Sequence, residues 1–205
     1  MTDLTECGPD VSRETLDALE TYCRLLEKWT SRINLIAPST TKDIWTRHIL
    51  DSAQLFSHAP EKIRHWVDLG SGGGLPAIVC AILAREHRPQ CRFTLMESDK
   101  RKSAFLISAA QTLGLDLTVR AERVETAPPQ SADVVSARAL APLPQLLFWV
   151  TRHLGPSGVA MLPKGKNYAT ELAAARAEWQ FDCTAIDSLT DPLAKILILK
   201  EVSRV

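Results

Sequence analysis

Apolar residues recur along this chain with two different spacings, and the change from one to the other falls near residue 60. From about 12 to 33 they return every three or four positions, the spacing of a helix with one apolar face, and Ser12 stands at its N-cap position. A weaker pattern of the same period predicts a second helix from about 41 to 56. We therefore predict an N-terminal helical extension over 1–60 and a separate unit over 61–205.

The second unit alternates short apolar runs with helical segments. The predicted strands are 65–69, 92–96, 117–120, 134–136, 159–162, 183–186 and 195–200, and the predicted helices are 75–85, 100–113, 145–154 and 170–179. Such alternation is typical of an α/β fold with a parallel sheet. The link 187–194 is too short for a helical crossover, so we expect a seven-stranded, mostly parallel sheet with an antiparallel last strand.

A glycine-rich segment between the first predicted strand and its helix carries the clearest chemical signal. Four of the nine glycines lie within 70–74, where they permit a sharp turn and close approach to a ligand. A turn without a ligand is the alternative. The lysine of a phosphate-binding P-loop is absent, and a dinucleotide motif fits only in a loose frame starting at Gly72. Asp68 would repel a pyrophosphate but could hold an ammonium group, directly or through water. The segment resembles motif I of class I S-adenosylmethionine methyltransferases.

Glu97 adds a second acidic signal, 27 positions after Gly70 at the end of the second predicted strand. A carboxylate at that point can accept hydrogen bonds from ribose hydroxyls. A solvated strand-end carboxylate would give the same pattern. Together with the glycine loop, Glu97 favours a nucleoside ligand.

Composition and charge exclude several classes of protein. Lys plus Arg and Asp plus Glu both number 24, which argues against a generally basic nucleic-acid binder. With no run of 18 apolar residues and no signal-peptide core near Met1, we expect no membrane span and a cytoplasmic location. The five cysteines are scattered without a Cys-x-x-Cys pair, which predicts reduced thiols and no metal site.

An ordered set of short segments is more specific than any one of them. The segments are Asn34-Leu35, Arg47 to Ser52, the glycine loop, Leu95 to Ser98, Lys100-Arg101, Phe105-Leu106, Arg123 to Glu125, Ser136 to Ala139 and Leu162 to Gly165. In order and spacing they resemble the small-subunit rRNA methyltransferase G family, from about residue 15 onward. The resemblance implies a Rossmann-like class I methyltransferase that transfers a methyl group from S-adenosylmethionine to N7 of a guanine in the 530 loop of 16S ribosomal RNA. The expected partner is that RNA, within the 30S subunit or a precursor, and we expect a monomer.

The candidate site residues come from the resemblance together with the charge and position of the residues themselves. Those expected to bind the cofactor are Asp68, Gly70, Gly72, Gly74, Leu75, Glu97, Val124, Glu125 and Arg138. Those expected to contact RNA are Arg47, His48, Arg101, Arg138 and Lys164. For each basic residue taken alone, the ordinary interpretation is a solvated surface charge, and His48 could also be a buried helix contact. The chain departs from the family pattern at Glu97, where many members have Asp, and at Pro163, which interrupts a Leu-Lys-Gly pattern.

The chemistry of guanine N7 simplifies the expected mechanism. This nitrogen carries a lone pair and no proton, so attack on a methyl group needs no general base, and we expect no catalytic acid or base. Catalysis would come from positioning, which contributes about 7–11 kcal/mol in favourable cases. The alternatives are a class I methyltransferase acting on a small molecule or protein, a non-catalytic S-adenosylmethionine sensor and, least favoured, a nicotinamide dehydrogenase.

Overall fold

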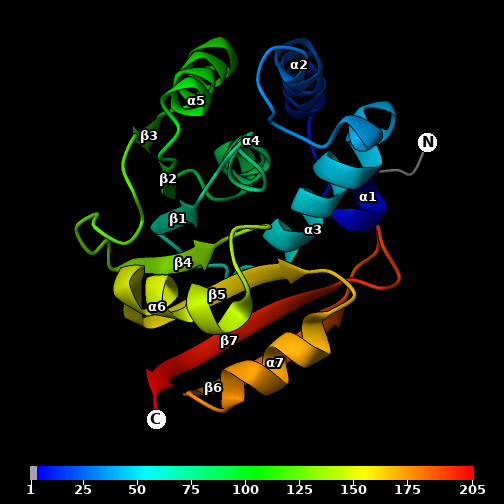
Figure 1. Cartoon of the computed structure of the whole chain (residues 1–205). Coiled ribbons are helices and arrows are strands. Elements are labelled where there is room, and N and C mark those ends of the chain that lie inside the picture. Colours follow the sequence, from blue (N-terminus) through cyan, green and yellow to red (C-terminus); the bar gives the residue numbers. More distant parts are fainter. Residues whose placement is uncertain (1–3) are drawn as a thin grey trace.

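The computed structural model describes residues 4–205 and confirms the predicted strand–helix alternation (Figure 1). The N-terminal elements are α1 (Leu4–Cys7), α2 (Arg13–Thr30), the 3-10 helix η1 (Pro38–Asp43), the π-helix η2 (Trp45–Leu50) and α3 (Asp51–Ser57). The strands are β1 (His65–Leu69), β2 (Arg92–Met96), β3 (Leu117–Arg120), β4 (Ala132–Ser136), β5 (Leu154–Lys164), β6 (Trp179–Asp187) and β7 (Lys195–Arg204). The helices between them are α4 (Ala77–His87), α5 (Lys100–Leu113), α6 (Leu143–His153) and α7 (Tyr168–Arg176).

The seven strands form one sheet in the order β3-β2-β1-β4-β5-β7-β6. The pairs from β3 to β5 are parallel, whereas β7 runs antiparallel to both β5 and β6. The predicted sheet, with its antiparallel last strand, is therefore confirmed.

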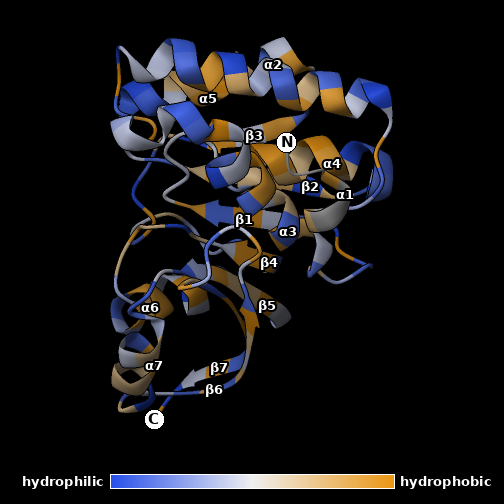
Figure 2. Ribbon diagram, turned by 90° about the vertical axis from the view of Figure 1, so that its right-hand side faces the viewer, coloured by the Kyte–Doolittle hydropathy of each residue, from blue (hydrophilic) through white to orange (hydrophobic). Residues whose placement is uncertain are grey.

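Helices cover both faces of the sheet (Figure 1). Along the central strands, successive side chains enter opposite layers, as the two-residue repeat of a strand requires. Trp66 packs in the cluster that contains α2, α4 and α5, and its neighbour Val67 packs in the cluster that contains α6. In Figure 2 the apolar colour is clear on α4, β4 and β5, which belong to the buried interior.

The N-terminal helices join the first of these layers. Leu19, Tyr22 and Leu26 of α2 are fully buried in the same cluster as Ile78 of α4 and Phe105 of α5. α2 starts as predicted, because the Ser12 side chain accepts a hydrogen bond from the Thr15 amide. The division of the chain at residue 60 stays a prediction about domain organisation. Among the described helices, none is both long and apolar enough to cross a bilayer.

Three predicted helices differ from the structure. The helix expected over 12–33 ends at Thr30, with Ser31 as its C-cap. The helix expected over 41–56 is divided among η1, η2 and α3. In the first of these, the hydroxyls of Thr40 and Thr41 donate to the carbonyls of Ala37 and Pro38, and such local bonds compete with the helical ladder. The helix expected over 170–179 ends at Arg176, because the sequence from 179 onward alternates buried and exposed residues as the strand β6.

Candidate cofactor and substrate site

The strand order brings the predicted site residues to one edge of the sheet. β1 and β4 are neighbours from which the remaining strands extend in opposite directions, and ligands of open α/β sheets bind at the carboxyl ends of such a pair. Gly70 follows β1, Glu97 follows β2, Arg138 follows β4 and Lys164 ends β5. Two cavities of about 760 and 370 Å³ lie along this edge. Both are bordered by the same five residues, which form a shared wall: Gly70, Gly72, Lys102, Ala139 and Leu140.

The Glu97 carboxylate organises the smaller cavity. One of its oxygens accepts a hydrogen bond from the Gly72 amide at 2.9 Å, and the other accepts from the Asp99 amide at 2.8 Å. A carboxylate offers about four lone-pair sites, so two are left for the hydroxyls of a ligand. Val124 and Trp149 border the same cavity, where their apolar side chains suit a flat ring. This cavity fits a nucleoside.

The glycine loop leaves room for a ligand beside Gly72. Gly70, Gly72 and Gly74 all have positive φ angles, of 64°, 55° and 85°. A Cβ atom at Gly70 would lie 2.4 Å from Leu140 Cδ1, and one at Gly74 would lie 2.5 Å from Ile78 Cδ1. At Gly72 the nearest atom to such a Cβ would be 3.8 Å away, so a side chain there would occupy open space next to Glu97. The loop is thus a cradle that a side chain would fill, and the residues present fit a bound cofactor.

Asp68 lies behind this loop. Its side chain is buried, and one oxygen accepts a 2.6 Å hydrogen bond from the Ser136 hydroxyl. Among the described residues the other oxygen has no hydrogen-bond partner. Burial raises the pKa of Asp68 to about 6, because the charged form loses its hydration. Asp68 is not among the described residues that border either cavity, so its predicted contact with an ammonium group stays a prediction.

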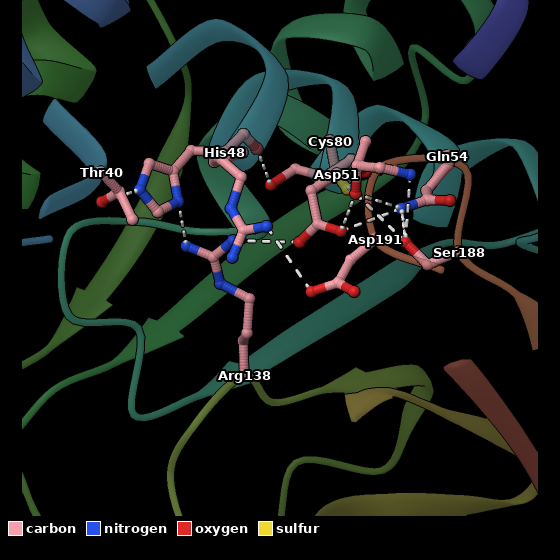
Figure 3. Close-up of polar contacts among 11 residues, drawn as sticks. Thr40, His48, Asp51, Gln54, Cys80, Arg138, Ser188 and Asp191 are labelled. Atoms are coloured by element: carbon pink, nitrogen blue, oxygen red, sulfur yellow. Dashed lines mark hydrogen bonds and ion pairs between the residues drawn. The ribbon is translucent and has the colours of Figure 1, made fainter. Parts of the chain in front are cut away.

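Arg138 borders the larger cavity, and its side chain points toward His48 and Asp51 (Figure 3). Its Nη1 donates to Asp51 Oδ2 at 3.1 Å, and its Nη2 donates to His48 Nδ1 at 3.0 Å. Asp51 begins α3 and His48 lies in η2, so the N-terminal helices hold an arginine that follows β4. The guanidinium is therefore fixed by one carboxylate and one imidazole.

The hydrogen bonds around His48 define its protonation. The Thr40 hydroxyl donates its one proton to the Ala37 carbonyl at 2.8 Å, so it can only accept from His48 Nε2–H, which lies 2.8 Å away. The proton on Nε2 leaves Nδ1 as the acceptor for Arg138. Burial, and secondarily the nearby Arg138 charge, lower the pKa of His48 to about 4. His48 is thus neutral at pH 7.

The other basic residues predicted to contact RNA occupy different positions. Arg47 borders the larger cavity and pairs with Asp191 at 3.5 Å. Lys164 also borders it, but its ammonium group donates to the Ala141 carbonyl at 2.9 Å and to Glu171 at 2.8 Å. Lys164 therefore braces the loop after Arg138. Arg101 is exposed and pairs with Asp99, and it is not among the residues bordering either cavity.

Of the predicted cofactor residues, the structure brings most to the two cavities. Gly70 and Gly72 border both, Leu75 and Arg138 border the larger one, and Glu97, Val124 and Glu125 border the smaller one. Gly74 packs against Ile78 instead. Sequence reasoning missed several residues: Asp51, Lys102, Trp149, Thr190 and Asp191. Lys102 could have been predicted from its positive charge, because it lies next to the predicted Arg101 in the first turn of α5.

Comparisons with known proteins agree with this geometry. A family model described as rRNA small subunit methyltransferase G matches residues 15–195. "Ribosomal RNA small subunit methyltransferase G" of Ruegeria sp. (strain TM1040) is 53% identical over 196 residues, covering 96% of this chain and 95% of the relative. The protein of that name from Cereibacter sphaeroides (strain ATCC 17025) is 55% identical and covers 96% of this chain and 94% of its own.

Solved structures support the fold alone. A methyltransferase from Aquifex aeolicus described as SAM-dependent aligns with a TM-score of 0.60 at 11% identity, covering 85% of this chain and 97% of that one. The mitomycin 7-O-methyltransferase aligns with the same score and identity, covering 92% of this chain and 68% of its own. Because the family model spans most of the sequence and the curated relatives share about half of their residues with it, this chain belongs to the rRNA small subunit methyltransferase G family.

Proposed function

We propose that this protein transfers a methyl group from S-adenosylmethionine to N7 of a guanine in the 530 loop of 16S ribosomal RNA. Family membership supports the reaction class. The observation that carries the proposal is the shared wall between a nucleoside-sized cavity and a wider one that contains Arg138. Two ligands in these cavities would meet at Gly70, Gly72 and Leu140.

The smaller cavity supports the cofactor assignment. When bound, S-adenosylmethionine supplies a methyl group on a positively charged sulfur. Glu97 would accept from the ribose hydroxyls while keeping its bonds to the loop amides. Val124, Glu125 and Trp149 would border the adenine. Of the remaining predicted cofactor residues, Gly70 and Gly72 border both cavities, and Leu75 and Arg138 are proposed to reach the cofactor from the larger one. Gly74 belongs to the same glycine loop, and the buried Asp68 lies behind it.

The larger cavity supports the RNA assignment. Guanine N7 has no proton to remove, so the residues here need only hold the base in line and exclude water. Arg138 can donate to an acceptor on the base or on a phosphate, and Lys102, which borders both cavities, can do so at the shared wall. N7 lies in the deep groove of A-form RNA, so the target is expected to be an unstacked loop base.

The partner and location follow from this assignment. The proposed substrate is 16S ribosomal RNA within the 30S subunit or a precursor particle. We propose that the protein acts on it in the cytoplasm and as a monomer. Arg47 and Arg101 are proposed to contact phosphates. Arg101 is exposed, and Arg47 is partly exposed at the cavity rim.

A transfer assay tests the proposal. The purified protein is incubated with methyl-labelled S-adenosylmethionine and, separately, with 30S subunits, precursor particles and bare 16S RNA. Label at a guanine N7 in the 530 loop, mapped by cleavage at the methylated base, is the expected result. Cofactor binding without transfer to any of these RNAs would instead favour the sensor, and transfer only to proteins or small molecules would favour the other methyltransferase class.

A further inference from the structure

We propose that Asp51 is a positioning residue that holds the Arg138 guanidinium in the larger cavity and connects it to the turn 188–194 between β6 and β7. The proposal rests on the function proposed above. It assigns a role in RNA methylation to Asp51 and Thr190, neither of which faces the cofactor cavity among the described residues.

The two oxygens of Asp51 have different partners (Figure 3). Oδ2 accepts from Arg138 Nη1 at 3.1 Å. Oδ1 accepts from the Thr190 hydroxyl at 2.8 Å and from Gln54 Nε2 at 2.9 Å. One carboxylate thus joins the loop after β4 to the turn after β6. These residues are 87 and 139 positions from Asp51 in the chain.

The turn is held against α3 by further contacts. Gln54 donates to the Ser188 hydroxyl at 3.1 Å and accepts from the Leu189 amide at 2.9 Å. Arg47 pairs with Asp191 at 3.5 Å. The turn therefore borders the larger cavity as an ordered wall whose position depends on the same carboxylate as Arg138.

This arrangement leaves Arg138 ready to bind. A guanidinium has five N–H groups, and its bonds to Asp51 and His48 use two of them. Among contacts between described residues, the other three are left for a ligand. Because both anchoring bonds already fix the side chain, little rotational freedom is lost when RNA binds. Asp51 also supplies the negative charge that compensates the Arg138 guanidinium, since the other acceptor, His48, is neutral.

The charge of Asp51 predicts an effect of Asp51→Asn that a loss of stability alone would not produce. Asp51→Asn keeps the shape of the side chain but removes its charge, so Arg138 becomes more mobile and carries an uncompensated positive charge. Phosphate attraction then stays the same or increases, while alignment of the base is lost. We expect RNA affinity that is equal or tighter and a single-turnover transfer rate that falls about 10-fold or more.

A double-mutant cycle tests whether Asp51 acts through Arg138. Single-turnover rates are measured for the wild type, Asp51→Asn, Arg138→Ala and the double variant on the RNA that the wild type methylates, with melting temperature and cofactor affinity recorded for each. In the Arg138→Ala background, Asp51→Asn should change the rate by less than about 2-fold, because the two residues act as a unit. An equal loss in both backgrounds would overturn the proposal, since it would place the effect of Asp51 elsewhere.

A second variant tests the role of the turn 188–194. It also keeps the proposal testable if Asp51→Asn folds poorly. Thr190→Val keeps a similar side-chain shape but removes the donor to Asp51, together with the contacts of the same hydroxyl to Gln54 at 3.4 Å and Ser188 at 3.1 Å. It should lower the rate about 3- to 10-fold, as expected when hydrogen bonds at the turn are lost. The matched control is Thr112→Val, whose exposed hydroxyl donates to the Ser108 carbonyl of its own helix, and its rate should not change. A normal rate for Thr190→Val would remove the turn from the proposal. A wild-type protein that methylates none of the RNAs overturns the proposed function itself, whereas failure of the cycle with an active wild type overturns only the role of Asp51.

Discussion

The two cavities share a wall but are assembled in different ways. The smaller one depends on segments close in sequence, in which a carboxylate accepts from backbone amides: Glu97 bonds to Gly72 and Asp99, which lie 25 and 2 positions away. The larger one depends on side chains that meet across the fold, with Arg138 bonded to His48 and Asp51 at separations of 90 and 87 positions. The first arrangement is built into local backbone geometry, whereas the second exists only after the N-terminal helices have packed.

This difference predicts two kinds of failure. Changes in the smaller cavity should act on cofactor affinity through shape, because the backbone that forms the glycine loop cannot easily move to accommodate added atoms. Changes in the larger cavity should act on the transfer rate through orientation and leave cofactor affinity nearly normal. A variant of one cavity that changes the quantity expected for the other would contradict this distinction.

The largest effect is expected at the glycine loop. Gly72→Asp places a carboxylate in the open space next to Glu97, where it fills the cradle and repels the existing charge. Cofactor affinity measured by calorimetry should fall more than about 100-fold, as expected for about 3 kcal/mol. Gly114→Asp is the matched control, because Gly114 has a similar φ of 62° with no atom within 4 Å of an added Cβ. Normal affinity for Gly72→Asp would refute the loop assignment.

The next effect is expected at Arg138. Arg138→Ala removes the donor from the larger cavity and leaves Asp51 and His48 without their shared partner, so the transfer rate should fall about 100-fold. Cofactor affinity should change much less, and the fold should persist. Arg24→Ala, which disrupts an exposed pair with Glu20, serves as the control. An unchanged rate would exclude Arg138 from the site.

A smaller effect is expected at Glu97. Glu97→Gln removes the charge that accepts from the Gly72 and Asp99 amides and is proposed to accept from ribose, so cofactor affinity should weaken about 10-fold. Glu97→Asp keeps the charge and should bind better than the Gln variant. The reverse order in titrations would show that side-chain length matters here more than charge.

The smallest effect on activity is expected from pH, which acts on stability: Asp68 behind the glycine loop and His48 at the larger cavity should respond in opposite directions. The pKa of Asp68 is raised to about 6 in the folded protein, so its contribution to stability is lost as pH rises from about 4 to 6. The pKa of His48 is lowered to about 4, so the folded state loses stability as pH falls from about 6.5 to 4.

Melting temperatures of two non-titrating variants test this opposition. Relative to the wild type, Asp68→Asn should gain stability as pH rises through the window, and His48→Asn should gain stability as pH falls through it. Each relative change should be about 5–10 °C, because a pKa that differs by about 2 between the folded and unfolded states corresponds to roughly 3 kcal/mol, and roughly 1 kcal/mol shifts the melting temperature of a protein this size by 2–4 °C. Parallel curves for all three proteins would show that neither group titrates in this window.

The sequence was most informative where chemistry is local. Clustered glycines after a strand and an acid at the end of the next strand predicted the two groups that now meet at 2.9 Å. Arg138 and His48 were expected at the site, but the bond between them and the role of Asp51 were not, because no spacing rule links residues 48 and 51 to residue 138. Thr190 was missed for the same reason.

Two sequence interpretations failed or changed for identifiable physical reasons. The single helix expected over 41–56 is divided because threonine hydroxyls compete for its carbonyls. Lys164 was expected to contact RNA, yet its ammonium group is already bonded to Glu171, whose carboxylate also accepts from the Leu143 amide at the start of α6. Partners of this kind depend on tertiary packing, which periodicity does not reveal. RNA contact by Lys164 stays a prediction.

The position of β7 affects how the protein folds during synthesis. This strand lies between β5 and β6 in the sheet, although it follows both in the chain. Until residues 195–204 have left the ribosome, β6 has no partner in the sheet and one edge of β5 stays open to pairing with other chains. The turn 188–194 also lacks the hairpin that holds it at the site. A nascent chain can therefore assemble its nucleoside cavity early, but it completes the RNA cavity only when the final hairpin closes.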